Sequence, residues 1–195
     1  RIYGSTWDTL SVYKDIPEIN WQEEVFGRKA KYQNHNVSFN GGNQNTRFNL
    51  SLTANLEDGV QLESGFDRYL ANFKIDHKAS DKFSIGFTAR YINQTIRGAG
   101  TTNSGTRQTN RLRHTIQYRP FEIPTAPEAD EFDEEYFIRS AFIINPVILT
   151  EAEFRRAYTQ GINLSTNLSY KILKNLTFRT VLGYDNTQVR TDLFF

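Results

Sequence analysis

Apolar and polar residues alternate along five segments of the chain. A period of two residues predicts β-strands that have one apolar and one polar face. A weaker strand near residues 36–40, with only Val37 and Phe39 as apolar positions, precedes the five. The apolar positions of the five segments are Phe48, Leu50, Leu52, Ala54 and Leu56; Tyr69, Ala71, Phe73 and Ile75; Phe83, Ile85, Phe87, Ala89 and Tyr91; Ile162, Leu164, Leu168 and Tyr170; and Leu176, Phe178, Leu182 and Tyr184.

The predicted strands are long, and the connections between them alternate in length. Each strand spans about nine residues, close to the 9–11 of a membrane-spanning strand and above the 5–6 usual in globular proteins. The connections are Gly41–Thr46 (short), Glu57–Asp67 (longer), Lys78–Asp81 (short), Asn93–Gly161 (very long) and Lys171–Asn175 (short). Outer-membrane barrels have short periplasmic turns and long extracellular loops. The sequence therefore predicts an up-and-down path with its short turns on the periplasmic side.

Aromatic residues lie at both ends of the apolar faces. This arrangement predicts Tyr69, Tyr91 and Tyr184 at the outer end of the strands, and Phe48, Phe83 and Tyr170 at the periplasmic end. Two aromatic rows around an aliphatic band are typical of membrane barrels. A soluble β-sandwich also has alternating strands and remains an alternative. The strand lengths, the unequal connections and the aromatic rows favour the barrel.

The opposite faces of these strands are polar, and we expect them to line a water-filled lumen. Three Asn-Leu-Ser sequences, at Asn49, Asn163 and Asn167, and one Asn-Leu-Thr, at Asn175, match glycosylation acceptors. The strand pattern explains most of them as inward-facing polar residues. Such residues would hydrate the interior and contact a plug or a passing substrate: Asn49, Ser51, Thr53, Asn72, Lys74, Thr88, Arg90, Asn163, Ser165, Asn167 and Arg179.

Three short elements are predicted in the connections. Asn20 can cap a helix over residues 21–26, with Glu23 completing the capping box. Thr150 can cap a second helix over residues 151–158, with Glu153 in the equivalent position. Residues 111–119 are predicted to form a strand that Pro120 ends.

Composition excludes several classes of protein. The 195 residues include 23 basic and 22 acidic side chains, no Cys and no Met. The absence of Cys excludes disulfides and thiolate metal sites, and a net charge of +1 argues against a nucleic-acid partner. No apolar run approaches the roughly 18 residues of a membrane helix. The hydrophobic fraction of 38% is low for a soluble core but suits a wall between lipid and water.

No arrangement of residues indicates an enzyme, a metal site or a cofactor. The acidic run at residues 128–135 lacks a cation-binding pattern and is interpreted as a solvated loop. His35, His77 and His114 lack metal-ligand spacing; we expect a structural role for His77. Aromatic residues outside the strands could stack on sugars but more often pin loops: Trp7, Tyr13, Trp21, Phe132, Tyr136 and Phe137.

Six stretches of the chain form a further pattern: Asn20–Phe26, Gln33–Gly42, Asp67–Tyr69, Ile75–Phe83, Asn145–Val147 and Leu173–Asp185. In this order and spacing they resemble the barrel region of SusC/RagA-type TonB-linked outer-membrane proteins. The resemblance implies a Gram-negative outer-membrane location and import of glycan or peptide nutrients. It also implies energy from the TonB complex and a SusD-like surface lipoprotein as partner, with outer-membrane lipid around the barrel.

The expected fold is therefore all-β, an antiparallel transmembrane barrel segment of about six strands with long extracellular loops and short loop helices. We expect a loop with a helix at residues 1–32, strands at 33–93, a long extracellular loop at 94–160 and a strand hairpin at 161–190. Because a TonB-type barrel closes with about 22 strands, we expect an internal segment without plug domain, TonB-binding segment or signal peptide. A soluble carbohydrate-binding sandwich and a non-transporting surface adhesin or structural barrel remain alternatives.

Overall fold

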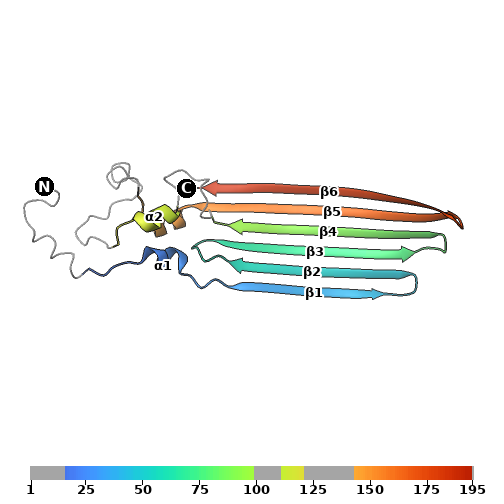
Figure 1. The fold of residues 1–195 in the computed structure, drawn as a ribbon, viewed down its shortest axis with the longest axis horizontal. Coiled ribbons are helices and arrows are strands. Elements are labelled where there is room, and N and C mark those ends of the chain that lie inside the picture. The colour runs from blue at the N-terminus through green and yellow to red at the C-terminus, as the bar shows by residue number, and fades with distance from the viewer. Residues whose placement is uncertain (1–15, 99–110, 121–142, 195) are drawn as a thin grey trace, which may run out of the picture. The chain divides into compact units, whose positions relative to one another are not determined.

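The computed structural model describes residues 16–98, 111–120 and 143–194. Three short helices and six strands make up the described part, as Figure 1 shows. They are α1 (Trp21–Phe26), β1 (Tyr32–Gly42), β2 (Thr46–Asp58), β3 (Gly65–Lys78), β4 (Phe83–Arg97), α2 (Arg111–Gln117), α4 (Pro146–Ala152), β5 (Phe154–Leu173) and β6 (Leu176–Phe194).

All six strands pair in one antiparallel sheet, and each strand pairs with its neighbours in sequence (Figure 1). The up-and-down order predicted from the connections is confirmed, and the weak strand near residues 36–40 is β1. The β-sandwich alternative is wrong for the described residues, because they form a single sheet rather than two packed ones. The ladders also run past the predicted limits: β5 has 20 residues and β6 has 19.

The short turns are built by side chains that bond the backbone. Asn43 accepts hydrogen bonds at its Oδ1 from the N–H groups of Asn45 (2.9 Å) and Thr46 (2.8 Å), which reverses the chain between β1 and β2. Gly42 precedes this turn with a φ of +154°, and a Cβ there would lie 2.2 Å from the Thr46 carbonyl oxygen. Ser80 acts similarly before β4, where its Oγ accepts from Phe83 N–H at 3.0 Å.

Helix α1 forms where the sequence predicts it. The Asn20 side chain accepts a hydrogen bond from Glu23 N–H at 3.2 Å, and the Gly27 N–H donates to the Glu23 carbonyl at 2.7 Å. The helix buries Trp21 and Val25. The Trp21 indole donates to the Arg119 carbonyl at 2.6 Å and meets the Tyr118 ring edge-on, with centroids 5.2 Å apart.

The strand predicted at residues 111–119 is wrong, because residues 111–117 form helix α2. Leu112 and Ile116, the apolar residues of this segment, are 44% and 60% exposed. The buried residues are Arg111, His114, Thr115 and Tyr118, and their spacing of three, four and seven residues is that of one helical face. Since most of that face is polar, hydrophobic periodicity does not reveal it.

The helix predicted at residues 151–158 is also wrong in its position. Helix α4 begins at Pro146, where Asn145 is the cap and its Oδ1 accepts from Val147 N–H at 2.9 Å. Pro at the first helical position is preorganised for this start. Thr150 is therefore inside the helix, where its hydroxyl donates to the Pro146 carbonyl at 2.6 Å. Glu153 is already extended, and residues 154–158 belong to β5.

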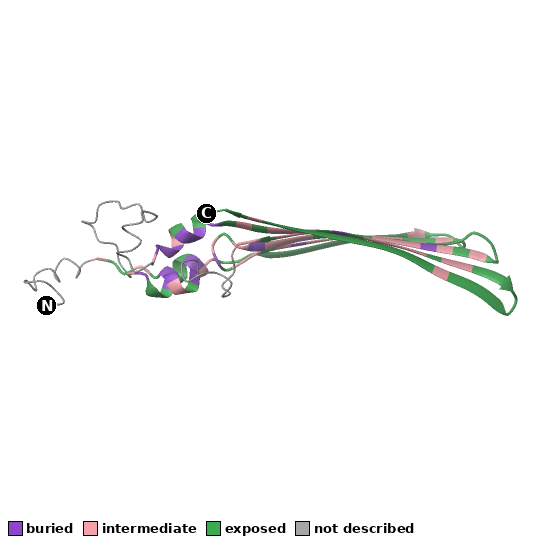
Figure 2. Cartoon of the chain, turned by 90° about the horizontal axis from the view of Figure 1, so that it is seen from above, coloured by how far each residue is buried: buried purple, intermediate pink, exposed green. Residues whose placement is uncertain are grey.

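The chain divides into two compact units, one with the helices and residues 60–62, the other with the six strands. Figure 2 shows burial concentrated in the helices, while the strands are mostly intermediate or exposed. The helical unit has a small apolar core of Trp21, Val25, Tyr118, Ile144 and Leu149. None of the helices in the described part is long and apolar enough to cross a membrane.

Candidate functional site

The apolar face of the sheet has a border where apolar residues give way to polar ones. On each strand we take the outer end of the unbroken apolar band, after which the next position on that face is polar: Leu56, Tyr69, Tyr91, Ile162 and Tyr184. Tyr158 and Phe154 on β5 and Phe194 on β6 lie further out on the same face, separated from the band by polar positions. These residues do not share one row. Leu56 pairs with Asp67, and Tyr69 pairs with Asn93, so the border steps back by one row at each of these strands.

The border continues in the same direction across the rest of the sheet. Tyr91 and Ile162 share a row, but Ile162 pairs with Asn186, one row beyond Tyr184. Successive rows on one face are two residues apart along a strand. Across the four gaps from β2 to β6 the border thus moves three rows, or six residues. This is a shift of about 20 Å along the strands over a distance of about 19 Å across them. A flat membrane surface would therefore cross the strands at about 45°, close to the tilt of outer-membrane strands.

The opposite border slants in the same sense. Phe48 and Ile75 share one row, whereas Phe83, Tyr170 and Phe178 share a row four residues further towards the β3–β4 turn. All six aromatic residues predicted to bracket the band lie on this apolar face and at its two borders. The band is exposed in the sheet, with Leu182 at 62% and Phe39 at 55%. Such a surface needs an apolar environment to cover it.

The predicted lumen-facing residues lie together on the other face. The register places Asn49, Lys74, Thr88 and Ser165 in one continuous row, and Ser51, Asn72, Arg90 and Asn163 in the next. Cross-strand hydrogen bonds join several of these polar side chains: Asn36 Nδ2 donates to Thr53 Oγ1 at 2.7 Å, and Asn163 Nδ2 donates to Asp185 Oδ2 at 2.9 Å. The side chains of the polar face thus support one another across the strands.

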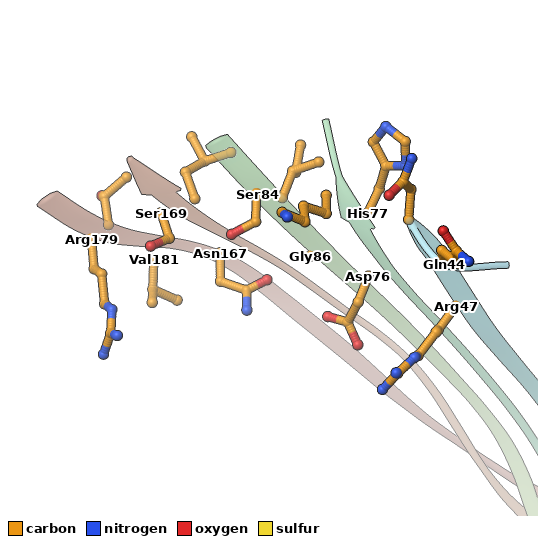
Figure 3. Close-up of a pocket in the computed structure, with 15 residues that line it drawn as sticks. Gln44, Arg47, Asp76, His77, Ser84, Gly86, Asn167, Ser169, Arg179 and Val181 are labelled. Atoms are coloured by element: carbon orange, nitrogen blue, oxygen red, sulfur yellow. The ribbon is translucent and has the colours of Figure 1, made fainter. Parts of the chain in front are cut away.

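A hollow of about 600 Å³ lies beside Gly86 on β4, near the short turns (Figure 3). A Cβ at Gly86 would lie 2.0 Å from Asn167 Oδ1 and 2.7 Å from Asp76 Oδ1, so these side chains lean over the glycine. Arg47 and Arg179 line the same hollow and make no hydrogen bond or ion pair within the described residues. Asp76 pairs with Lys74 at 3.4 Å. The hollow therefore presents two unpaired guanidinium groups.

A second hollow, of about 480 Å³, lies beside Gly161 on β5. Here a Cβ would lie 2.8 Å from Ile92 Cγ2 and 3.3 Å from Thr187 Oγ1. Glycine inside a strand often marks a place where a ligand or another backbone approaches closely. The sequence analysis missed both hollows. The available signal is a glycine at a polar-face position, seen at Gly86 and Gly161.

The histidines do not form a site. His77 Nδ1 lies 2.7 Å from Thr46 Oγ1, and His35 Nε2 lies 3.3 Å from Gln33 Oε1, so each has a partner on or beside its own strand. His114 is buried, and its Nδ1 accepts from Ile144 N–H at 2.9 Å. Among residues 16–98, 111–120 and 143–194, no group of three or more His, Asp or Glu side chains is placed to hold a metal ion.

The helical unit contains a buried ion pair. Arg111 Nη2 contacts Glu153 Oε2, and the two side chains are 1% and 4% exposed. Burial lowers the pKa of the Arg111 guanidinium, and the charge and hydrogen bond of Glu153 oppose that shift. The acidic run at residues 128–135 and the aromatic residues Trp7, Tyr13, Phe132, Tyr136 and Phe137 lie outside the described residues.

Curated relatives match part of a longer protein. The chain is 26% identical over 179 residues to TonB-dependent receptor P3 of Formosa agariphila, covering 87% of the chain and 17% of that receptor. It is 28% identical over 95 residues to TonB-dependent receptor SusC of Bacteroides thetaiotaomicron, covering 48% of the chain and 9% of SusC. No family model matches the sequence. The chain thus spans less than a fifth of the curated relatives it matches.

Solved structures of the RagAB peptide importer share the fold. Its open-open state matches 98% of the chain and 22% of the importer chain, with a TM-score of 0.68 and 17% identity. Its closed-closed state matches the same shares with a TM-score of 0.63 and 16% identity.

The fold and the slanting band define the class: the chain is an antiparallel wall segment of a transmembrane β-barrel. The resemblance to SusC/RagA-type TonB-linked outer-membrane proteins, which six short stretches indicate, is confirmed by relatives and structures of that kind.

Proposed function

We propose that the chain is part of the barrel of an outer-membrane TonB-dependent transporter that imports nutrients. The observation that carries this proposal is the two-faced sheet: a slanting apolar band with aromatic borders on one face and a polar, hollowed wall on the other. Lipid suits the first face, and a water-filled passage suits the second. The short turns are assigned to the periplasmic side and the long connections to the cell exterior.

The proposal includes partners and parts outside these residues. A plug domain gates the lumen, the TonB complex supplies energy, and a SusD-like lipoprotein assists capture at the surface. The RagAB and SusC similarities support this assembly, since RagAB is described as a peptide importer and SusC as a TonB-dependent receptor. Both glycan and peptide substrates agree with a polar lumen.

Fractionation and uptake test this proposal on the full-length protein in its native cells. We expect it in the outer membrane, resistant to carbonate extraction, and we expect growth on a specific nutrient to fail when its gene or TonB is deleted. A soluble location contradicts the barrel. An outer-membrane location with unchanged growth on every nutrient tried supports the alternative of a non-transporting adhesin or structural barrel.

A further inference from the structure

The polar face of the sheet is interrupted by apolar side chains, among them the pair Phe66–Ile96 and, two rows closer to the short turns, the pair Leu70–Ile92. Leu70 on β3 pairs directly with Ile92 on β4, and Ile92 pairs with Gly161 on β5. Both side chains are only partly buried and belong to the face whose other positions in these rows are polar. Apolar side chains exposed to water carry an unfavourable hydration free energy, which an apolar group that covers them removes. The Gly161 hollow therefore has an aliphatic floor.

The row next to this floor carries opposite charges that do not pair with each other. Arg90 pairs in register with Asn163, and Asn163 with Asp185, so Arg90 and Asp185 are two strands apart, about 10 Å between backbones. Within the described residues Arg90 makes no hydrogen bond or ion pair, and Asp185 receives only the Asn163 amide. Both charged groups line the hollow. The rim thus offers one free cation and one free anion.

An amide oxygen on the same rim also lacks a partner. Asn72 Oδ1 is buried and accepts no hydrogen bond from the described residues. A buried acceptor without a donor carries a desolvation cost that a bound N–H group would relieve. Asn72 lies directly opposite Arg90 in the ladder, between the aliphatic floor and the Asn49 row.

We propose that the Gly161 hollow binds a short peptide that carries an aliphatic side chain between a positive and a negative group. The side chain covers Leu70, Ile92 and Gly161, a carboxylate pairs with Arg90, and an ammonium group pairs with Asp185. A peptide N–H donates to Asn72 Oδ1. A tripeptide spans about 10 Å when extended, which fits the two charged groups.

Peptide fits this hollow better than an uncharged sugar. A neutral glycan leaves both Arg90 and Asp185 without a counter-charge, and the side chains that form the floor, Leu70 and Ile92, are aliphatic. Unpaired charges next to a bound ligand weaken binding because they lose water without gaining a partner. This inference rests on the proposed function, since it places a substrate contact in the lumen of the same transporter.

Binding measurements on the purified full-length protein in detergent test the proposal. The probe is a leucine-centred tripeptide with free termini, compared by calorimetry with the same peptide C-amidated, the same peptide N-acetylated, and cellotriose. We expect each blocked peptide to bind about tenfold more weakly, and cellotriose not to compete. Equal affinity of free and blocked peptides, or competition by cellotriose, overturns the proposal.

Variants connect each terminus to its residue. Arg90→Gln should weaken the free peptide about tenfold yet leave the affinity of the C-amidated peptide unchanged, and Asp185→Asn should do the same for the N-acetylated peptide. These paired losses do not depend on whether the variant folds slightly less well, because each variant is compared with itself. Losses that are the same for free and blocked peptides overturn the assignment.

A matched glycine pair tests the hollow itself. Gly161→Val should abolish peptide binding because its side chain occupies the floor, whereas Gly183→Val on the neighbouring strand should not, because the nearest atom to a Cβ there is 3.9 Å away. Equal effects of the two variants, or a lower melting temperature of Gly161→Val with unchanged affinity, overturn the proposal. Outer-membrane location and nutrient uptake that persist in such a case leave the proposed function intact.

Discussion

A buried ion pair determines which substitutions the centre of the helical unit tolerates. Arg111 and Glu153 are buried together although they are 42 positions apart in sequence, and Arg111 Nε and Nη1 have no partner within the described residues. Removing one member of a buried ion pair leaves the other charge without compensation, which costs more than removing both. We therefore expect the loss of one partner to lower the stability of the helical unit more than the loss of both.

Arg111→Met should destabilise the helical unit by about 3–5 kcal/mol, because Glu153 is left buried and unpaired. The double variant Arg111→Met/Glu153→Leu should recover most of that loss. Hydrogen exchange of the α2 and α4 amides in the full-length protein measures both effects. A double variant that is no more stable than the single one contradicts this account of the pair.

The caps act at the same scale. Asn145→Ala removes the acceptor for the Val147 N–H and should cost about 1 kcal/mol at the start of α4. Glu151→Ala, an exposed position in the same helix, is the control and should have little effect. Protease cleavage rates near residue 146 report the difference, and equal rates for both variants would show that the cap is not limiting.

The two faces of a strand differ in which side chains they tolerate. Leu52 lies in the middle of the apolar band on β2, and Ser51, one position earlier, lies on the polar face. A charge on the lipid side must leave water, whereas a charge on the lumen side keeps its hydration. The same substitution one residue apart should therefore have very different consequences.

Leu52→Arg should destabilise the folded barrel by about 2–4 kcal/mol, and Ser51→Arg by less than about 1 kcal/mol. Urea unfolding of the full-length protein in lipid vesicles, followed by heat-modifiable gel mobility, measures the free energy of both variants. Similar losses at the two positions would mean that the apolar face does not contact lipid.

At this scale the sequence predicts strands better than helices, and the reason is physical. The strands β2 to β6 alternate along the apolar band, because one face of each strand is apolar there and the opposite face is mostly polar. Helix α2 is different: its buried face holds Arg111, His114 and Thr115, so burial and hydrophobicity do not coincide. Helix α4 begins earlier in the sequence than predicted, because Asn145 as cap and Pro146 at the first helical position form a stronger helix start than Thr150.

The extent of the strands was also underestimated. Beyond Tyr184, the positions of β6 on the apolar face are Asn186, Gln188 and Arg190. Because these residues are polar, the alternation that predicts a strand ends at Tyr184. The ladder continues because β5 and β6 satisfy each other's backbone groups without needing lipid. The hollows at Gly86 and Gly161 escaped prediction because they depend on register between strands, which alternation within one strand does not specify.

For the whole molecule, the slanting border predicts that residues in one hydrogen-bonded row lie at different depths. Leu52 and Asn186 belong to the same row, four strands apart. If the strands tilt by about 45°, a label at Leu52→Cys is within the hydrocarbon while a label at Asn186→Cys is in water. The chain itself has no Cys, which makes single labels at these positions selective within it.

Spin labels at these two positions in lipid vesicles measure depth through their accessibility to oxygen and to a water-soluble nickel chelate. We expect oxygen contact to dominate at residue 52 and nickel contact at residue 186. Tyr91→Cys, from the same row near the border, should be intermediate. Equal accessibility at all three positions would indicate strands that stand upright in the membrane.

The ladder between neighbouring strands is continuous apart from one irregularity, between Lys171 and Leu173 beside the last short turn. One added residue anywhere else in a strand would move every following side chain to the opposite face, exchanging lipid contacts for lumen contacts along its whole length. Insertions and epitope tags are thus confined to the connections, and the turns at residues 43–45 and 79–82 are among the described places where the chain can be lengthened without changing which face each side chain occupies.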